Sequence, residues 1–429
     1  MFKLFEPFQS GFRKGHSTET ALVRVMNDLL VSADSGASTI LVLLDLSAAF
    51  DTVCHSILIN RLERWLGITG TVLNWFKSYL TDRTQFVALG NNKSELGQVC
   101  NGVPQGSVMG PISFSVYMLP LGQIIRKYGL GYHFYAADTQ MYISSKSDPT
   151  FTSTILSECV LEIKTWMHHN FLKLNCSKTE VLLIGTPVAI HKGSNLNLIM
   201  DDNVVLPSAQ ARNLGVIFDT HLTLDSHIKN ITKSAFHYLR NIARIRPFLT
   251  PPDAERLIHA FVTSRTDYCN ALFIGLPAKS IKRLQYIQNS VARILTYTPS
   301  GQHITGVRYS LHWLPVQSRI VFKTLTLTYK TIHETAPSYI CDLVTCYTPS
   351  RSLRSADSLT LQQPPYRLKS MGERAFSVAA PRLWNAVPIA VRDAHTLASF
   401  KKLLRLIFLK LLLWTVSNIL LCCTVMSIL

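Results

Sequence analysis

Hydrophobic and polar residues follow one another near the start of the chain in patterns typical of a helix and then a buried strand. Residues 17–31 carry apolar side chains at helical spacing after Ser17, which can cap a helix. An apolar run from Ile40 to Leu44 follows and ends on Asp45. Such a run is typical of a buried strand. We therefore expect a central strand that presents the Asp45 carboxylate at its end.

The pattern up to about residue 220 predicts a domain in which helices and strands are mixed. Three glycines, Gly102, Gly106 and Gly110, mark a loop within it. Helices are expected at 56–66, 70–80, 111–128 and 151–171, and strands at 85–89, 95–100, 132–135, 139–143, 179–184 and 213–218. This order of elements implies an α+β or α/β sheet domain.

Beyond residue 225 the pattern becomes almost entirely helical. One face of residues 228–245 collects the apolar residues Ile228, Ile231, Ala235, Tyr238, Leu239, Ile242 and Ile245. The opposite face collects four cations, Lys229, Lys233, Arg240 and Arg244. We expect the apolar face to pack against the protein. The cationic face is either an ordinary solvated surface or a basic stripe for nucleic acid.

The remaining pattern predicts more helices and two segments without a core of their own. Helices are expected at 253–264, capped by Asp253, and at 280–295, capped by Ser280. Residues 347–370 are rich in serine and proline and are interpreted as a linker. A compact segment follows, and residues 411–429 form an apolar tail without a charge.

Charge is distributed unevenly between the two halves. Residues 1–224 hold 17 Lys and Arg against 17 Asp and Glu, whereas residues 225–410 hold 26 against 9. The net charge of +17 therefore lies wholly in the second half. A strongly basic region favours a polyanionic partner, most often nucleic acid, although a basic solvated surface is the alternative.

The cysteines indicate a reducing, intracellular environment. There are nine, an odd number without a disulfide-like spacing, and the chain starts without a signal peptide. Cys341 and Cys346 form a close pair, but no second pair of Cys or His lies beside them at zinc spacing. We therefore expect free thiols and no zinc site.

Several motifs follow one another in an order that resembles the reverse transcriptases of non-LTR (LINE-type) retrotransposons. They comprise the Asp45–Val53 segment, the glycine-rich loop Gly102–Pro111, the hairpin Phe134–Gln140, the Leu174–Glu180 segment, Asn213–Val216 and the Gln9–Arg13 segment with Ser17–Glu19. A later segment from Arg374 to Asn385 is similar to the C-terminal region of such elements. Each motif is modest alone, whereas their common order is specific. The resemblance covers roughly residues 5–405.

The resemblance implies a fragment of a right-hand polymerase of the α+β class. The domains expected from it are partial fingers at 1–38, a palm with an embedded finger segment at 39–222, a helical thumb at 223–300, a C-terminal helical region at 301–346, the linker at 347–370, a C-terminal segment at 371–410 and the tail. The endonuclease and earlier finger motifs of the family do not precede the Gln9 segment, so a truncated copy is expected.

The resemblance also implies the chemistry of nucleotide transfer. Polymerases of this kind clamp the reacting oxygens with two Mg²⁺ ions held by carboxylates. Asp45 and Asp138 would ligate the metals, and Lys178 would donate a proton to the leaving pyrophosphate. Phe50 would be the steric gate at the sugar 2′ position. Arg13, Gln105 and Gly106 would contact the incoming nucleotide. An ordinary structural role is the alternative for each of the last five residues.

One departure from the family pattern decides the expected activity. Ala137 occupies the position at which the family has the first of two adjacent aspartates. A methyl group cannot ligate a metal, so we expect this copy to be inactive or severely impaired as an RNA-directed DNA polymerase. The alternative is a non-catalytic remnant that binds RNA or DNA through the basic thumb.

The resemblance implies partners as well as a reaction. These are an RNA template, a DNA primer or target and deoxynucleoside triphosphates, in the cytoplasm or nucleus. The tail at 411–429 has the minimum length for a membrane span. Read-through past a decayed or frame-shifted end is the preferred interpretation of this tail, so a membrane partner is not expected.

Overall fold

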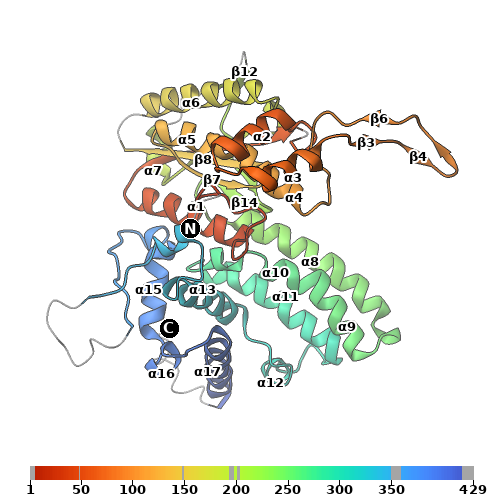
Figure 1. Cartoon of the computed structure of the whole chain (residues 1–429). Helices are drawn as coiled ribbons and strands as arrows, with labels where there is room; N and C mark the ends of the chain where they lie inside the picture. The colour runs from red at the N-terminus through yellow and green to blue at the C-terminus, as the bar shows by residue number, and fades with distance from the viewer. Residues whose placement is uncertain are drawn as a thin grey trace. The chain divides into compact units, whose positions relative to one another are not determined.

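The computed structural model describes residues 5–47, 49–146, 149–192, 198–200, 203–348 and 359–417. The chain forms two compact units. One consists of Met1–Ala21 and Gly36–Ala211, and the other of Leu22–Ser35 and Arg212–Leu429. Figure 1 labels their helices and strands. Helix α1 (Thr18–Asp34) passes from the first unit into the second.

The first unit is built on a four-stranded antiparallel sheet with the strand order β10-β1-β8-β7. Its strands are β1 (Ser38–Leu44), β7 (Gly131–Tyr135), β8 (Asp138–Ser145) and β10 (Glu180–Ile184). Every residue of β1 is buried, as its unbroken apolar run predicts. The predicted strand that ends on Asp45 is thereby confirmed.

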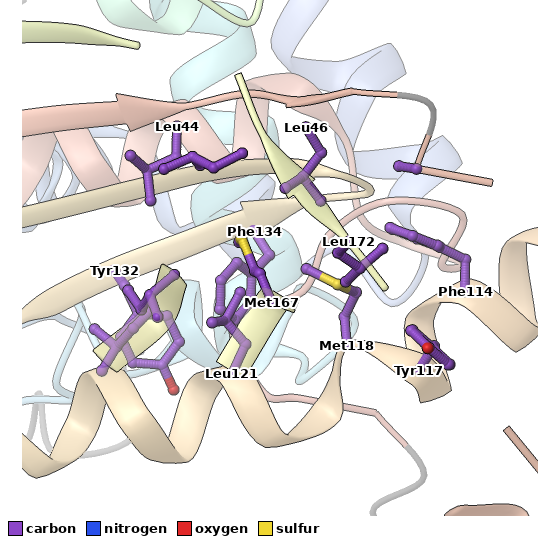
Figure 2. Close-up of a cluster of buried hydrophobic side chains, with 14 of the residues drawn as sticks. Leu44, Leu46, Phe114, Tyr117, Met118, Leu121, Tyr132, Phe134, Met167 and Leu172 are labelled. Carbon is purple, nitrogen blue, oxygen red and sulfur yellow. The ribbon is translucent and has the colours of Figure 1, made fainter. Parts of the chain in front are cut away.

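Three helices cover one face of this sheet: α4 (Met109–Tyr117), α5 (Leu119–Lys127) and α6 (Pro149–His169). Alternate residues of β1 enter the resulting core, because successive side chains of a strand point to opposite faces. Figure 2 shows Leu44 of β1 and Tyr132 and Phe134 of β7 beside aromatic and aliphatic side chains of the helices. Burial of each such side chain contributes on the order of 1.5–3 kcal/mol.

An arm extends from the first unit (Figure 1). It follows α2 (His55–Arg64) and α3 (Gly70–Leu80). Its two predicted strands are broken into four short ones: β3 (Thr84–Gln85) pairs with β6 (Gly97–Gln98), and β4 (Ala88–Leu89) pairs with β5 (Asn92–Lys93). All eight strand residues are exposed, so the arm contributes little to the core.

Short elements complete the first unit. They are β2 (Leu46–Ser47), β9 (Lys173–Leu174), the 3₁₀ turn Cys176–Lys178, α7 (Pro187–Lys192), β11 (Leu198–Met200) and β12 (Asn203–Val205). Strand β2 pairs with β9, and β11 pairs with β12.

The described part of the second unit is mostly helical. It also contains the hairpin of β13 (Gln210–Asn213), which begins at the end of the first unit, and β14 (Val216–Asp219). Its α-helices are α8 (Asp225–Ile245), α9 (Pro251–Ile258), α10 (Ser264–Asp267), α11 (Ala278–Thr296), α12 (Thr305–Ser310), α13 (Val316–Ile332), α14 (Ser338–Cys341), α15 (Phe376–Ala386), α16 (Ile389–Arg392) and α17 (Leu397–Ser417). A π-helical turn, His259–Thr263, joins α9 to α10, and short 3₁₀ turns lie at Arg246–Phe248, Asn270–Phe273 and Gly372–Arg374.

The second half of α1 belongs to the helical unit through polar contacts with its C-terminal part. The Asp34 carboxylate accepts hydrogen bonds from the backbone N–H groups of Arg367, Leu368 and Gly372. Asn27 accepts another from the Ser377 N–H. These bonds join segments more than 300 positions apart in the sequence.

Two predicted elements of the first half differ from the structure. The predicted helix 111–128 is two helices that meet at Met118, because Pro120 has no N–H to continue the first one. The predicted strand 213–218 is a hairpin instead. Its turn contains Leu214, with φ +43°, and Gly215, with φ +85°.

Two predicted helix caps are also wrong. The N-cap of α9 is Thr250, whose hydroxyl accepts a hydrogen bond from the Asp253 N–H. Helix α11 begins after Pro277. The Ser280 hydroxyl donates instead to the Asp225 carboxylate at 3.0 Å.

The predicted linker and tail lie partly outside the described residues, which exclude 349–358 and 418–429. Within the described part of the linker, Leu361 is buried and its N–H donates to the Asn385 side chain. The tail begins inside a helix, since α17 continues to Ser417. Among the residues that the structure describes, no helix has both the length and the apolar character needed to cross a membrane.

Candidate polymerase site

The register of the sheet brings two of the predicted carboxylates together. Leu44, the last residue of β1, pairs with Thr139 of β8. Asp45 directly follows β1, and Asp138 is the first residue of β8. The two aspartates therefore lie at the same end of two paired strands. The charge of Asp45 contributes to the pKa of Asp138, which also shows their proximity.

A two-residue turn, Ala136-Ala137, joins β7 to β8 beside these carboxylates. Ala136 has φ +54°, a conformation that is unfavourable for a residue with a side chain. The Gln9 side chain holds this turn: its Nε2 donates to the Ala136 carbonyl at 3.1 Å, and its Oε1 accepts from the Ala136 N–H at 2.8 Å. Gly11 lies so close that an added Cβ would be 2.3 Å from the Ala136 nitrogen.

Lys178 lies near Asp45, in the 3₁₀ turn Cys176–Lys178 that follows α6 and β9. Leu46 of β2 pairs with Leu174 of β9, and the Asn175 N–H donates to the Asp45 carbonyl at 2.9 Å. The Lys178 Nζ lies 3.3 Å from the Asp45 Oδ2. This exposed ammonium offsets part of the negative charge of Asp45.

The electrostatic environment disfavours a charge on Asp138. Desolvation, followed by the negative charge of Asp45, raises the pKa of Asp138 above its usual value. Solvent screens much of this effect, because the side chain remains exposed.

The glycine-rich loop lies against the segment that follows Asp45. The Gly102 N–H donates to the Val53 carbonyl at 2.8 Å, and the Val103 N–H donates to the Phe50 carbonyl at 3.0 Å. Gly102 has φ +86°, and a Cβ there would be 2.9 Å from the Asp51 carbonyl oxygen. The loop therefore requires glycine at this position.

Phe50, Gln105 and Gly106 come together through these contacts. The Phe50 ring is half-buried and stacks on Phe114 with ring centroids 4.7 Å apart. Gln105 is exposed, and its Nε2 donates to the Asp51 carboxylate at 3.0 Å. Gly106 is exposed with φ +81°.

Arg13 has backbone partners within its own segment. Its guanidinium donates to the carbonyls of Glu6 at 2.9 Å and Gln9 at 2.8 Å, and it lies over the Phe5 ring. In this arrangement Arg13 fixes the loop that carries Gln9. Its predicted contact with a triphosphate stays a prediction.

Comparison with known proteins identifies the family of this site. The model of the family described as reverse transcriptase (RNA-dependent DNA polymerase) matches residues 1–239, more than half of the chain. The chain belongs to the reverse transcriptase family.

The relatives of this reverse transcriptase are polymerases of non-LTR elements, so the LINE-type resemblance is confirmed. In Drosophila melanogaster the chain is 27% identical over 335 residues to the probable RNA-directed DNA polymerase from transposon BS. It is 26% identical over 309 residues to the RNA-directed DNA polymerase from mobile element jockey, and 29% identical over 300 residues to the probable RNA-directed DNA polymerase from transposon X-element.

The matches differ in how much of each chain they cover. They cover 74%, 69% and 67% of this chain but only 35%, 32% and 32% of the respective relatives. The chain therefore spans about a third of the length of these polymerases. A solved telomerase from Candida albicans, in complex with a fragment of telomeric RNA, covers 71% of the chain at 12% identity, with a TM-score of only 0.36.

Reverse transcriptases generally use Mg²⁺, and the carboxylates of this chain can be compared with that requirement. Asp45 and Asp138 converge, but the third expected ligand position carries the Ala137 methyl group. The described residues contain no cluster of three Asp, Glu, His or Cys side chains that could hold a metal. The donor set is therefore one carboxylate short of the three expected around a pair of divalent ions.

The four predicted cations of α8 lie on its solvent face. Lys229, Lys233, Arg240 and Arg244 are all exposed, and among the described residues none of them forms an ion pair. The opposite face is buried as predicted at Ile228, Ile231, Ala235, Leu239 and Ile242. Ile245 is exposed, contrary to the prediction, because it is the last residue of the helix.

Sequence reasoning missed two residues that shape the site. Gln9 was recognised as part of a motif without a role, and no local pattern indicates that its amide holds a turn 127 positions later. His55 was not singled out, yet its Nε2 lies 2.7 Å from the Gly102 carbonyl and ties α2 to the glycine-rich loop. The only local signal is the glycine at position 102, since glycine is common where a backbone adopts a positive φ or is approached closely.

Proposed function

We propose that this chain is a reverse transcriptase domain whose polymerase site is inactive or severely impaired, because Ala137 removes one metal-ligating carboxylate. The observation that carries the proposal is the position of Ala137. It is the second residue of the turn between β7 and β8, directly before Asp138, and Asp138 faces the end of β1 at Asp45. A carboxylate at this turn would join the other two.

The roles of the remaining groups follow from the family and from their positions. Asp45 and Asp138 would be the metal ligands, and Lys178 the proton donor to pyrophosphate. The 3.3 Å contact between Lys178 and Asp45 supports a position for Lys178 at the reacting end of the site. With Ala137 in place, this ammonium faces two carboxylates instead of three.

The nucleotide would lie against the glycine-rich loop. Phe50 stacks on Phe114, meets the edge of the Phe12 ring and stays half-buried, which suits a gate at the sugar 2′ position. Gln105 and Gly106 would approach the nucleotide from the loop, where the absence of a side chain at Gly106 allows close contact. Arg13 would contribute through the loop that it holds in place.

The partners proposed for this domain are an RNA template, a DNA primer or target and deoxynucleoside triphosphates. The partial fingers (1–38), palm (39–222), thumb (223–300) and C-terminal regions remain the proposed subdivision. Helix α8 lies within the proposed thumb. Its four exposed cations support contact with nucleic-acid phosphates.

A second candidate function rests on the same helix. A chain without polymerase activity could still bind RNA or DNA through Lys229, Lys233, Arg240 and Arg244. Primer extension on an RNA template separates the two functions, because binding alone incorporates no nucleotide. Comparison of the chain with its Ala137→Asp variant tests whether the hairpin causes the loss. Extension by the unaltered chain at a rate close to that of the variant would refute the proposal.

A further inference from the structure

A groove lined by cations and aromatic rings lies in the helical unit, and its lining residues come from elements other than α8. One hollow of about 440 Å³ is lined by residues of α9, the π-helical turn, α10, the 311–314 loop, α13 and α17. A second hollow, of about 640 Å³, is lined by residues of the same loop, α13 and α17. Both include His312, Phe322 and Arg405, so the two hollows adjoin one another at these residues, and we call the pair the groove.

The groove is positively charged. Its walls carry the cations Arg319, Lys323, Lys401, Lys402 and Arg405 and the carboxylates Glu255 and Asp267. Asp267 is paired with Arg319, so the negative charge at the floor is offset. Lys401 and Lys402 are exposed on α17 and extend the cationic surface toward the second hollow. An anionic ligand fits this charge distribution.

Aromatic and unsatisfied polar groups lie in the same groove. Trp313 and Phe322 are half-buried and line the walls. Asn270 is 5% exposed, and its amide oxygen has no hydrogen-bond partner among the described residues. The Asn270 amide oxygen is itself buried, so it belongs to the wall of the groove and is not open to a ligand.

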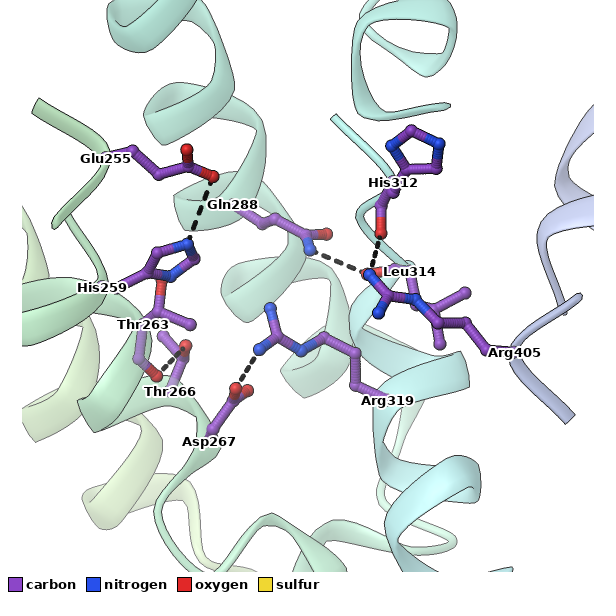
Figure 3. Close-up of polar contacts among 10 residues, drawn as sticks. All are labelled: Glu255, His259, Thr263, Thr266, Asp267, Gln288, His312, Leu314, Arg319 and Arg405. Carbon is purple, nitrogen blue, oxygen red and sulfur yellow. Dashed lines mark hydrogen bonds and ion pairs between the residues drawn. The ribbon is translucent and has the colours of Figure 1, made fainter. Parts of the chain in front are cut away.

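The walls of the groove are fixed by the surrounding helices. Gln288 of α11 donates to the Leu314 carbonyl at 2.8 Å, and Arg405 of α17 donates to the His312 carbonyl at 2.8 Å. In the view of Figure 3, Glu255, His259 and Asp267 lie on one side and His312, Leu314 and Arg405 on the other, with Arg319 between them. The loop that carries Trp313 is therefore held at both ends.

We propose that this groove binds a single strand of nucleic acid, as a site separate from the polymerase site and from α8. The cations contact phosphates, and Trp313 and Phe322 stack on unpaired bases. Bases in a duplex are stacked and paired inside the helix and cannot enter such a hollow. The ligand class is thus single-stranded RNA or DNA.

The test uses the full chain with Lys229, Lys233, Arg240 and Arg244 all changed to Gln, so that α8 does not contribute. Fluorescence anisotropy measures binding of labelled 20-nucleotide oligo(U), oligo(dT) and a 20-base-pair duplex. We expect residual binding of the single strands that exceeds binding of the duplex. Absence of residual single-strand binding would overturn the proposal and leave the proposed polymerase function untouched.

Two groove variants with a matched control locate the binding. Trp313→Ala is expected to weaken oligo(U) binding about tenfold, the effect of losing one stacked base, and Trp313→Phe to restore most of it. The pair Lys401→Gln and Lys402→Gln should reduce the salt slope by about 1.4, because each lost phosphate contact on a single strand contributes about 0.7. The exposed pair Lys279→Gln and Lys282→Gln on α11 removes the same charge outside the groove and should leave the slope unchanged.

Each outcome decides the proposal once thermal unfolding has shown that the variants are folded. Equal effects of the Lys401/Lys402 pair and the Lys279/Lys282 pair would show general charge attraction and overturn it. Displacement of oligo(U) by polyglutamate at the same phosphate-equivalent concentration would show a site for any polyanion, and would overturn the assignment to nucleic acid. Loss of binding in Trp313→Ala with recovery in Trp313→Phe would confirm base stacking.

Discussion

The side-chain amide of Gln9 forms a reciprocal pair of hydrogen bonds with the backbone of Ala136. Its oxygen accepts a further bond from the Gly11 N–H at 2.8 Å. Ala136 has the left-handed φ of +54°, which costs about 1–2 kcal/mol for a residue with a side chain. The amide of Gln9 thus stabilises a strained turn that places Ala137 and Asp138 next to Asp45.

Replacement of Gln9 by alanine should loosen this turn. Three hydrogen bonds are lost, each worth about 1 kcal/mol, so we expect the free energy of unfolding to fall by about 3 kcal/mol in urea titrations. Hydrogen exchange at the Ala136 N–H should accelerate. Gln9→Glu would place a carboxylate oxygen against the Ala136 carbonyl at a buried position, so its loss should be at least as large. A Gln9→Ala variant as stable as the original chain would show that the amide does not hold the turn.

His227 should make the helical unit less stable in acid. Burial, followed by the positive charge of Arg212, lowers the pKa of His227 to about 4. The unfolded chain, with a histidine pKa of about 6.5, binds the proton more readily. Neutral His227 therefore contributes its full stabilisation above about pH 6.5. As the pH falls toward 4, the free energy of unfolding decreases by up to about 3 kcal/mol.

Urea unfolding at pH 7 and pH 4.5 measures this effect. The His227→Gln variant lacks the titrating group but keeps a side chain that can accept the Ile217 N–H, which donates to His227 Nδ1 at 3.4 Å. Its stability should decrease less between the two pH values than that of the original chain. Parallel decreases would mean that other groups cause the acid sensitivity.

The four cations of α8 should contribute most of the salt dependence of nucleic-acid binding outside the proposed groove. Four phosphate contacts correspond to a slope of about −3 to −4 in a plot of log affinity against log salt concentration. Changing Lys229, Lys233, Arg240 and Arg244 to Gln should reduce the slope by about this amount on an RNA–DNA hybrid. An unchanged slope would assign these residues to an ordinary solvated surface.

Removal of the Asp45 charge should lower the pKa of Asp138. Desolvation and the charge of Asp45 together raise the pKa of Asp138, so the folded protein favours the protonated carboxyl. The charged form of Asp138 destabilises the folded protein once the pH rises through the raised pKa. The Asp45→Asn variant should titrate Asp138 at a lower pH in carbon-13 NMR spectra. Asp82→Asn changes an exposed carboxylate at the end of α3 and should leave the titration where it was. An unchanged pKa in Asp45→Asn would show that the two carboxylates do not interact.

The sequence predicts those parts of the site that depend on local patterns. Asp45 lies where predicted, because a short unbroken apolar run favours a buried strand, and the register of that strand determines the neighbour of Asp138. The clamp by Gln9 depends on a contact across 127 positions, for which one sequence contains no signal. Ser280 failed as a cap because its hydroxyl bonds Asp225 of another helix, and such tertiary competition is invisible in a local pattern.

The contrast between local patterns and tertiary contacts also explains why the basic groove could not be located from the sequence. Its charge could be predicted as part of the excess in residues 225–410, but not its location. Trp313, Asn270 and Lys402 come from three separate segments and meet only through the packing of α17 on α12 and α13. The helix α8 stripe was predictable because all four of its cations belong to one helix of regular period.

The last prediction concerns Ala137. Its side chain packs against the core of the first unit at the second position of the turn. Aspartate there would add a third carboxylate beside Asp138 and Asp45. Titration with Mn²⁺, followed by electron paramagnetic resonance, should show tighter binding to Ala137→Asp than to the original chain. Asp45→Ala added to the restored variant should remove the gain, and Asp82→Asn should not.

Primer extension then tests whether the restored ligand also restores catalysis. Metal clamping stabilises the transition state by several kcal/mol, and each 1.36 kcal/mol changes the rate tenfold. The restored chain should therefore extend primers faster than the chain with Ala137 by a factor on the order of 10³ or more. Because the chain spans about a third of the length of its relatives, the assay uses a chimera in which residues 5–417 replace the segment of the jockey polymerase that this chain matches. The rest of that polymerase is the same in every version, so the comparison isolates the residue at position 137. We expect extension with Mg²⁺ on a primed RNA template only from the chimera with Ala137→Asp, and none when Asp45→Ala is added. If the chimera that retains Ala137 extends primers within about tenfold of the restored one, Asp45 and Asp138 suffice for catalysis, and the proposed cause of inactivity is wrong.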